Sequence, residues 1–70
     1  GLSVYRLLCA QAGPYLKASG QLMVEIGYDQ GAPVQVIFQE NGFTEIKCIQ
    51  DIEGRDRVVR GIWRGENAAD

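Results

Sequence analysis

The sequence contains no histidine and only two cysteines, and these shortages remove the commonest side chains of catalytic and metal-binding sites. Histidine is the usual general base near neutral pH and the commonest zinc ligand. Cys9 and Cys48 stand far apart in apolar surroundings, so they cannot form a metal site by themselves. We expect both thiols to behave as small buried hydrophobic groups, with a single long-range disulfide as the alternative.

A surplus of positive charge is also missing, because seven Lys and Arg face nine Asp and Glu and the formal net charge is −2. Proteins that bind nucleic-acid phosphates rely on clustered positive charge, so direct binding of nucleic acid is not expected. No apolar run approaches the ~18 residues that a membrane span needs. No signal peptide opens the chain, so the sequence predicts neither a nucleic-acid partner nor a membrane partner.

The residues that are present have the composition of a small globular domain. The chain has 70 residues, of which 46% are hydrophobic and 23% charged. Such proportions are ordinary for a folded domain and do not indicate disorder. A chain of this length buries only roughly 60% of its unfolded surface, so we expect one domain with a small core.

The first part of the chain has the apolar spacing of a helix. Between residues 2 and 12 apolar side chains recur on one face: Tyr5, Leu8, Cys9 and Ala12. Ser3 is a candidate N-cap, since its hydroxyl can accept from an unpaired amide. A short extra turn is expected at 14–17, because proline is not tolerated inside a helix. We expect Tyr5 to pack its ring and leave its hydroxyl in water.

A strand and a second helix follow. Residues 21–26, QLMVEI, are too short for a helix and apolar on both faces apart from Glu25, which predicts a strand covered on both sides. From about Asp29 to Asn41 the helical period returns. Val34, Ile37 and Phe38 share a face of this helix, and the glycine after Asn41 is a strong stop signal.

Two further strands are predicted, at residues 44–51 and 57–63, with a turn at 53–56 between them. Val58 and Val59 are adjacent and apolar, so the last strand is apolar on both faces and is expected in the centre. The predicted fold class is α/β, in the order helix, strand, helix, strand, strand. The sheet is expected to be mixed and three-stranded, with the last strand antiparallel and central and helices on its faces.

The first strand would then form an apolar sheet edge without a neighbour. Proteins normally protect such an edge with charge, proline or a covering segment, and QLMVEI has little of these. The pattern therefore resembles part of a larger sheet.

Four stretches in the same order carry a family resemblance over about sixty residues. They are GLSVYRLL, YLKASGQLMVEIGYDQG, ENGFT and DIEGRDRVVRG. The chain resembles the C-terminal segment of the release factor glutamine methyltransferases, the PrmC/HemK family of S-adenosylmethionine-dependent enzymes. The most specific stretches are EIGYDQG and GRDRVV, because they match type and spacing at several positions.

The resemblance implies a Rossmann-like methyltransferase sheet, with residues 1–64 as the C-terminal portion of the domain and 65–70 as a flexible tail. The implied cytoplasmic parent enzyme transfers a methyl group from S-adenosylmethionine to the side-chain amide of a glutamine in a peptide-chain release factor. The family's glycine-rich turn, acidic ribose-binding residue and Asn-Pro-Pro-Tyr motif do not occur here. We therefore expect no catalytic, cofactor-binding or metal-binding residue in this segment, no tight cofactor binding and no activity of the chain alone.

One candidate site remains, in the residues that follow the first strand. Ligands in open α/β sheets sit beyond the carboxyl ends of parallel strands. Gly27, Tyr28, Asp29 and Gln30 lie at such an end and are predicted to form one wall of the parent's substrate cleft, with Tyr28 or Gln30 touching the release factor. The structural alternative is that Gly27 permits a turn and Asp29 caps the next helix.

Two further hypotheses stay open. Arg55, Asp56 and Arg57 could form a site for phosphate or an acidic partner, or they could be a solvated hairpin tip with a local ion pair. The whole chain could instead be an autonomous small interaction module. Such a module would use its exposed first strand for strand addition or for self-association.

Overall fold

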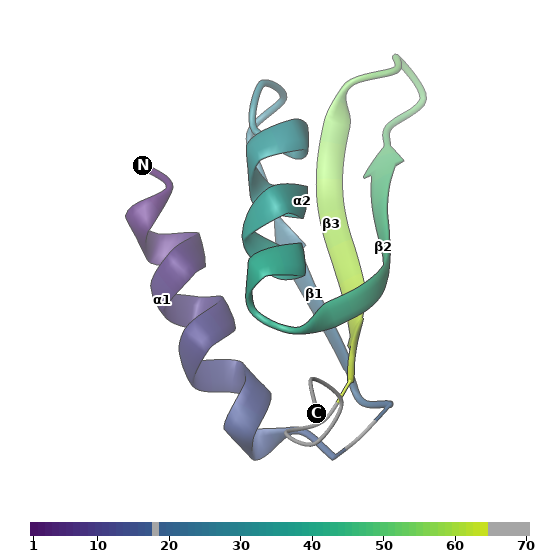
Figure 1. Cartoon of the computed structure of the whole chain (residues 1–70). Coiled ribbons are helices and arrows are strands. Elements are labelled where there is room, and N and C mark those ends of the chain that lie inside the picture. Colours follow the sequence, from purple (N-terminus) through teal and green to yellow (C-terminus); the bar gives the residue numbers. More distant parts are fainter. Residues whose placement is uncertain (18, 65–70) are drawn as a thin grey trace.

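A computed structural model describes residues 1–17 and 19–64 (Figure 1). The predicted tail at 65–70 lies outside the described residues. In chain order the elements are α1 (Ser3–Ala12), a 3₁₀ turn η1 (Gly13–Tyr15), β1 (Gln21–Glu25), α2 (Gly31–Glu40), β2 (Phe43–Gln50) and β3 (Asp56–Trp63). The described chain therefore has the predicted order of helix, strand, helix, strand and strand.

The three strands form one sheet in the order β1-β3-β2. In β1 Val24 lies opposite Val59, and in β2 Cys48 lies opposite the same residue. The central antiparallel position of the last strand is confirmed. The prediction of a mixed sheet was wrong, because β3 separates the two strands that run the same way and both hydrogen-bonded pairs are antiparallel.

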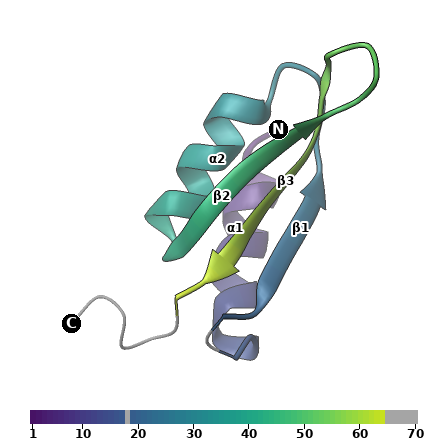
Figure 2. The same cartoon turned by 90° about the vertical axis from the view of Figure 1, so that its right-hand side faces the viewer.

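Only one face of the sheet is covered within the described residues. Every sheet residue that belongs to the core, or packs against it, lies on this face: Leu22, Val24, Phe43, Ile46, Cys48, Val59 and Trp63. On the other face Met23 is 53% exposed and Ile49 is 42% exposed. Figure 2 shows both helices on the same side of the sheet. Helices on both faces, and a first strand covered on both sides, were therefore wrong predictions for this chain.

The core is built where α2 crosses the sheet. Val34 and Phe38 are completely buried, as is Val59 of the central strand. The rings of Phe38 and Phe43 lie 5.1 Å apart and are tilted by 54°. This approach needs glycine at position 61, since an added Cβ would lie 2.9 Å from the Phe38 ring. The small core is thus closed by aromatic packing over a strand glycine.

Two local predictions can be compared directly with the structure. Gly42 has a φ of +89°, which confirms the glycine stop after α2. Ser3 is not an N-cap: Leu2 takes this position, has helical dihedral angles and makes no side-chain cap bond. The packing of Leu2 against the core starts the helix one residue earlier than the hydroxyl signal predicts.

The state of the two thiols and the length of the helices test two further expectations. Both thiols are free, so the disulfide alternative was wrong; Cys9 is buried and Cys48 is half-buried. Among the described residues, neither helix has the length and apolar character needed to cross a membrane.

Candidate functional site

The predicted cleft wall lies in the loop between β1 and α2. Since β1 and β2 both run antiparallel to β3, their carboxyl ends lie at the same margin of the sheet. The loop before α2 and the β2–β3 hairpin loop accordingly lie at one end of the molecule (Figure 1). The amide of Ile26 donates a hydrogen bond to the carbonyl of Arg57 at 2.8 Å and joins the two regions. This margin is where open α/β sheets place ligands.

Gln30 turns its side chain back into the loop. Its Oε1 accepts a hydrogen bond of 2.8 Å from the amide of Gly27 and lies 3.4 Å from the hydroxyl of Tyr5. The amide of Gln30 donates in turn to the carbonyl of Gly27 at 3.0 Å. Gln30 therefore holds the loop in shape, and its oxygen is already engaged with groups of the same chain.

Tyr5 anchors this loop to the first helix. Its hydroxyl donates to the carbonyl of Glu25 at 3.0 Å, close to the weaker contact with Gln30. The expectation that this hydroxyl would be left to water was wrong, because α1 brings it to the end of β1. No motif in the sequence indicated this contact between residues far apart in the chain.

Tyr28 and Asp29 are the exposed residues of this loop. The side chain of Tyr28 is 68% exposed, and Asp29 is also exposed. Asp29 does not cap α2, contrary to the capping alternative: Gln30 holds the N-cap position, without a side-chain cap bond. Of the four predicted wall residues, Gly27 and Gln30 thus form the frame of the loop, while Tyr28 and Asp29 are presented to the outside.

A carboxylate from another strand lies at the start of α2. The side chain of Asp56 packs so closely against Gly31 that an added Cβ would overlap it. Gln50 donates from Nε2 to Oδ1 of Asp56 at 3.0 Å. A negative charge near a helix N-terminus is electrostatically favourable. Gly31, the first residue of α2, was the sequence signal that could have indicated this close approach.

Cys48 lies beside this carboxylate and is held in its protonated form. Burial raises the pKa of the Cys48 thiol, and the charge of Asp56 and a hydrogen bond to it raise the pKa further. Burial also raises the pKa of Cys9 to about 11. Nucleophilic cysteines need a lowered pKa, so neither thiol is prepared for covalent chemistry.

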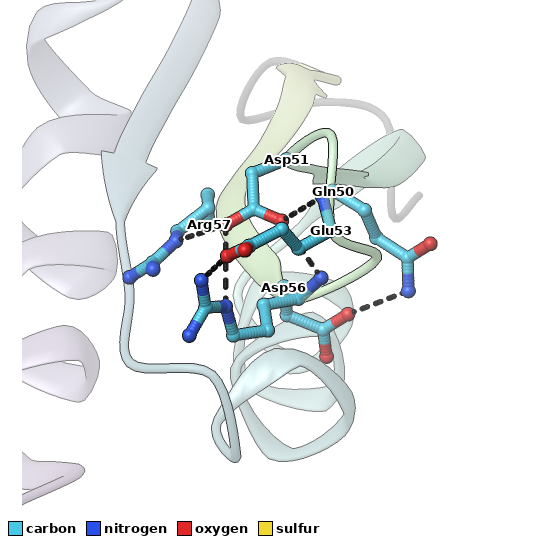
Figure 3. Close-up of polar contacts among 6 residues, drawn as sticks. Gln50, Asp51, Glu53, Asp56 and Arg57 are labelled. Carbon is cyan, nitrogen blue, oxygen red and sulfur yellow. Dashed lines mark hydrogen bonds and ion pairs between the residues drawn. The ribbon is translucent and has the colours of Figure 1, made fainter.

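The hairpin tip between β2 and β3 is organised by Asp51 (Figure 3). Its Oδ1 accepts from the amides of Glu53 at 2.9 Å and Arg55 at 3.0 Å, while Oδ2 accepts from Nε of Arg57 at 2.9 Å. The amide of Arg55, followed by the guanidinium of Arg57, lowers the pKa of the Asp51 carboxyl. Arg55 also pairs with Glu53. The two arginines therefore form local ion pairs, which supports the solvated-tip interpretation.

A shallow groove runs along the outer side of β1. It has a volume of about 630 Å³ and is lined by residues of α1, β1 and the loop: Gly1, Val4, Tyr5, Leu8, Met23, Val24, Glu25 and Gln30. Within the described chain, no three His, Cys, Asp or Glu side chains come together in a way that could hold a metal ion. The groove is apolar on the helix side and carries one carboxylate at its strand side.

The chain is similar in sequence to several known proteins. The release factor glutamine methyltransferase of Agrobacterium fabrum is 44% identical over 59 residues, which is 84% of this chain and 20% of the relative. The protein of the same name in Caulobacter vibrioides is 42% identical over 62 residues, 89% of this chain and 22% of the relative. The one in Neisseria gonorrhoeae is 43% identical over 63 residues, 90% of this chain and 23% of the relative.

No protein-family model and no solved structure matches the chain. The relatives place it in a methyltransferase family. More particularly, the chain corresponds to a segment of the release factor glutamine methyltransferases, the family that the motifs of the sequence resemble. It spans about a fifth to a quarter of the length of these relatives.

Proposed function

We propose that the chain is the C-terminal portion of a methyltransferase domain with a Rossmann-like sheet. The parent enzyme would transfer a methyl group from S-adenosylmethionine to the side-chain amide of a glutamine in a peptide-chain release factor. The observation that carries this proposal is the identity of 41% over 93% of the chain with a release factor glutamine methyltransferase of Xylella fastidiosa, together with the relatives described above. The cytoplasm is the proposed location, where release factors work.

The topology of the described strands supports this proposal. An antiparallel last strand lies between two strands that run the same way, as the family resemblance implies for the end of the sheet. The loop at residues 27–30 lies at the margin where such sheets bind ligands. Both features fit a segment that shapes a cleft from one side.

Within that cleft we assign different roles to the loop residues. Tyr28 and Asp29 are exposed, so they are the side chains that could touch the release factor. Gln30 and Tyr5 position the loop through the contacts to Gly27 and Glu25. A glutamine amide is a weak nucleophile, and its correct orientation is a large part of the catalytic task. The chain would contribute to this orientation through the shape of the wall.

We propose that the described residues do not hold the cofactor. The polar groups of the loop bond to one another, and the arginines of the hairpin tip pair with Asp51 and Glu53. S-adenosylmethionine would supply the methyl group, and other parts of the parent would bind it. We propose that the isolated chain neither binds the cofactor tightly nor transfers methyl groups.

A hybrid enzyme tests the proposed function. The chain replaces the matching segment of the Caulobacter vibrioides relative, and methylation of a release factor is followed by mass spectrometry of its tryptic peptides. We expect the hybrid to add one methyl group to a glutamine side chain, and Tyr28→Ala in the hybrid to raise KM for the release factor with little change in kcat.

Two controls distinguish the contribution of this segment from the contribution of the rest of the parent enzyme. The isolated chain, tested in the same assay and titrated with S-adenosylmethionine, should show no methyl transfer and no saturable amide shifts at micromolar cofactor. Tyr15→Ala, the same substitution at a 90% exposed tyrosine in η1, which precedes the amino end of β1, should leave KM unchanged. A hybrid that folds, binds the cofactor and still leaves the release factor unmodified would contradict the proposed function.

A further inference from the structure

The loop at residues 27–30 is attached to β3 at both of its ends. Before the loop, the amide of Ile26 donates a hydrogen bond of 2.8 Å to the carbonyl of Arg57. After the loop, Gly31 begins α2 and packs against the side chain of Asp56. Asp56 and Arg57 are the first two residues of β3, so the start of this strand holds both ends of the loop.

The two attachments differ in what they require of the sequence. The bond at Arg57 uses a backbone carbonyl, which every residue supplies. The contact at Gly31 uses the side chain of Asp56, whose carboxylate occupies the space of the missing Cβ. This carboxylate is itself held in place: Nε2 of Gln50 donates to its Oδ1 at 3.0 Å, and Cys48 also makes a side-chain hydrogen bond to it. The second attachment is therefore the one that a single side chain controls.

A displacement of Gly31 would be passed directly to the loop. Gln30 precedes it in the chain and closes the loop twice. Its Oε1 accepts from the amide of Gly27 at 2.8 Å, and its own amide donates to the carbonyl of Gly27 at 3.0 Å. Tyr28 lies between these two residues and is 68% exposed. The place at which Tyr28 is presented therefore depends on where Gly31 rests.

We propose that Asp56 is a positioning residue for the substrate-cleft wall, because it sets the place of Gly31 and thereby the place of Tyr28. The inference rests on the proposed function, in which Tyr28 touches the release factor. Asp56 acts from behind the wall, since its own carboxylate is engaged by Gln50 and Cys48. Small displacements of a group that orients a substrate have large effects on an enzyme, so this support belongs to the working geometry of the cleft.

Kinetics of the hybrid enzyme test this role. Asp56→Ala removes the support behind Gly31 and should raise KM for the release factor about three- to tenfold, with little change in kcat. Unfolding of a fraction of the enzyme would instead lower kcat and leave KM unchanged. Asp56→Asn keeps the volume beside Gly31 and an acceptor for Gln50, so KM should stay within about twofold of its value in the unmodified hybrid.

A double variant tests whether Asp56 acts through Tyr28. In the Tyr28→Ala background, Asp56→Ala should change KM by less than about twofold, because the group that it positions is gone. Gly31→Ala disturbs the same contact from the helix side and should raise KM as Asp56→Ala does. Glu40→Ala removes an exposed carboxylate at the other end of α2, so it is the matched control and should leave KM unchanged.

Amide exchange gives a readout that does not require activity. In the hybrid, Asp56→Ala should speed exchange of the Gly27 amide by about threefold or more, since Gln30 loses its fixed position. Circular dichroism shows which variants are folded, and Gly31→Ala takes the place of an Asp56→Ala variant that does not fold. A hybrid without methyl transfer contradicts the proposed function. An unchanged exchange rate, an unchanged KM in an active hybrid, or effects additive with those of Tyr28→Ala would overturn the role of Asp56 alone.

Discussion

At the scale of single residues, the contact between Asp56 and Gly31 determines how closely α2 can approach β3. Gly31 is buried, and an added Cβ would overlap the Asp56 carboxylate and lie 3.0 Å from Sγ of Cys48. Glycine inside a helix normally costs about 0.5–1 kcal/mol relative to alanine. Glycine is nevertheless needed at position 31, because the Asp56 carboxylate occupies the space that a larger side chain would fill.

Replacement of Gly31 is expected to lower the free energy of unfolding. Gly31→Ala should lower the free energy of unfolding by about 1–2 kcal/mol, because overpacking outweighs the gain in helix propensity. The measurement is urea unfolding followed by circular dichroism.

The matched experiment adds Asp56→Ala. In the Gly31→Ala background this change removes the overlap, so it should cost less stability than in the original chain, or even restore stability. If Gly31→Ala alone made the chain more stable, the close packing of Asp56 would be refuted.

At the scale of an element, the start of α2 is set by tertiary contacts and not by a local cap. Asp29 has the side chain that favours an N-cap, yet Gln30 holds that position. The side chain of Gln30 bonds to the amide of Gly27, and Tyr5 reaches the same place from α1. The loop is therefore fixed from inside, which frees Asp29 and Tyr28 to face outward.

Exchange of the Gly27 amide tests this organisation. Gln30→Ala removes the acceptor of this amide, so its hydrogen exchange should become about tenfold faster. Asp29→Ala should change the free energy of unfolding by less than about 0.5 kcal/mol, whereas loss of a true cap typically costs ~1 kcal/mol. A larger loss with Asp29→Ala than with Gln30→Ala would show that local capping governs the helix start.

At the scale of the whole molecule, the chain is a sheet with one covered face. α1 and α2 both pack on that face, and the opposite face carries Met23 and Ile49 with about half of their surface exposed. Antiparallel sheets commonly pack one face on the core and leave the other in water. The one-sided core therefore fits the antiparallel pairing of all three strands.

Two adjacent valines of β3 test this one-sided core. Val59 is completely buried on the covered face, whereas Val58 is half-buried on the other. Val59→Ala should lower the free energy of unfolding by about 2 kcal/mol through lost packing and a residual cavity. Val58→Ala, the same change one residue away, should cost less than about 1 kcal/mol. Equal losses in urea unfolding would contradict a core on one face.

Much of the fold followed from local patterns in the sequence. Helical spacing identified α1 and α2, and the glycine at position 42 marked the end of α2 with its positive φ. The adjacent valines of β3 predicted a central place for this strand, and the strand order β1-β3-β2 confirms it. These signals are visible in sequence since they depend on residues close together in the chain.

The loop that carries the candidate site lies between β1 and α2 as the sequence predicts, but the contacts inside the loop were not predicted. Its place after β1 follows from strand order, but the inward turn of Gln30 depends on Tyr5, which is 25 residues away in the chain. Likewise, the contact of Asp56 with Gly31 joins two segments through the sheet. Periodicity describes which face of an element is apolar, and it does not specify which distant side chain that face will meet.

The sequence by itself thus determined the elements, the central strand, the family and the position of the loop at residues 27–30. The tertiary structure alone decided that both helices cover the same face and that Gln30 frames the loop while Tyr28 is exposed. It also decided that Asp56 lies at the start of α2. The physical reason is that elements form from neighbouring residues, whereas side-chain roles follow from contacts made only when the elements pack.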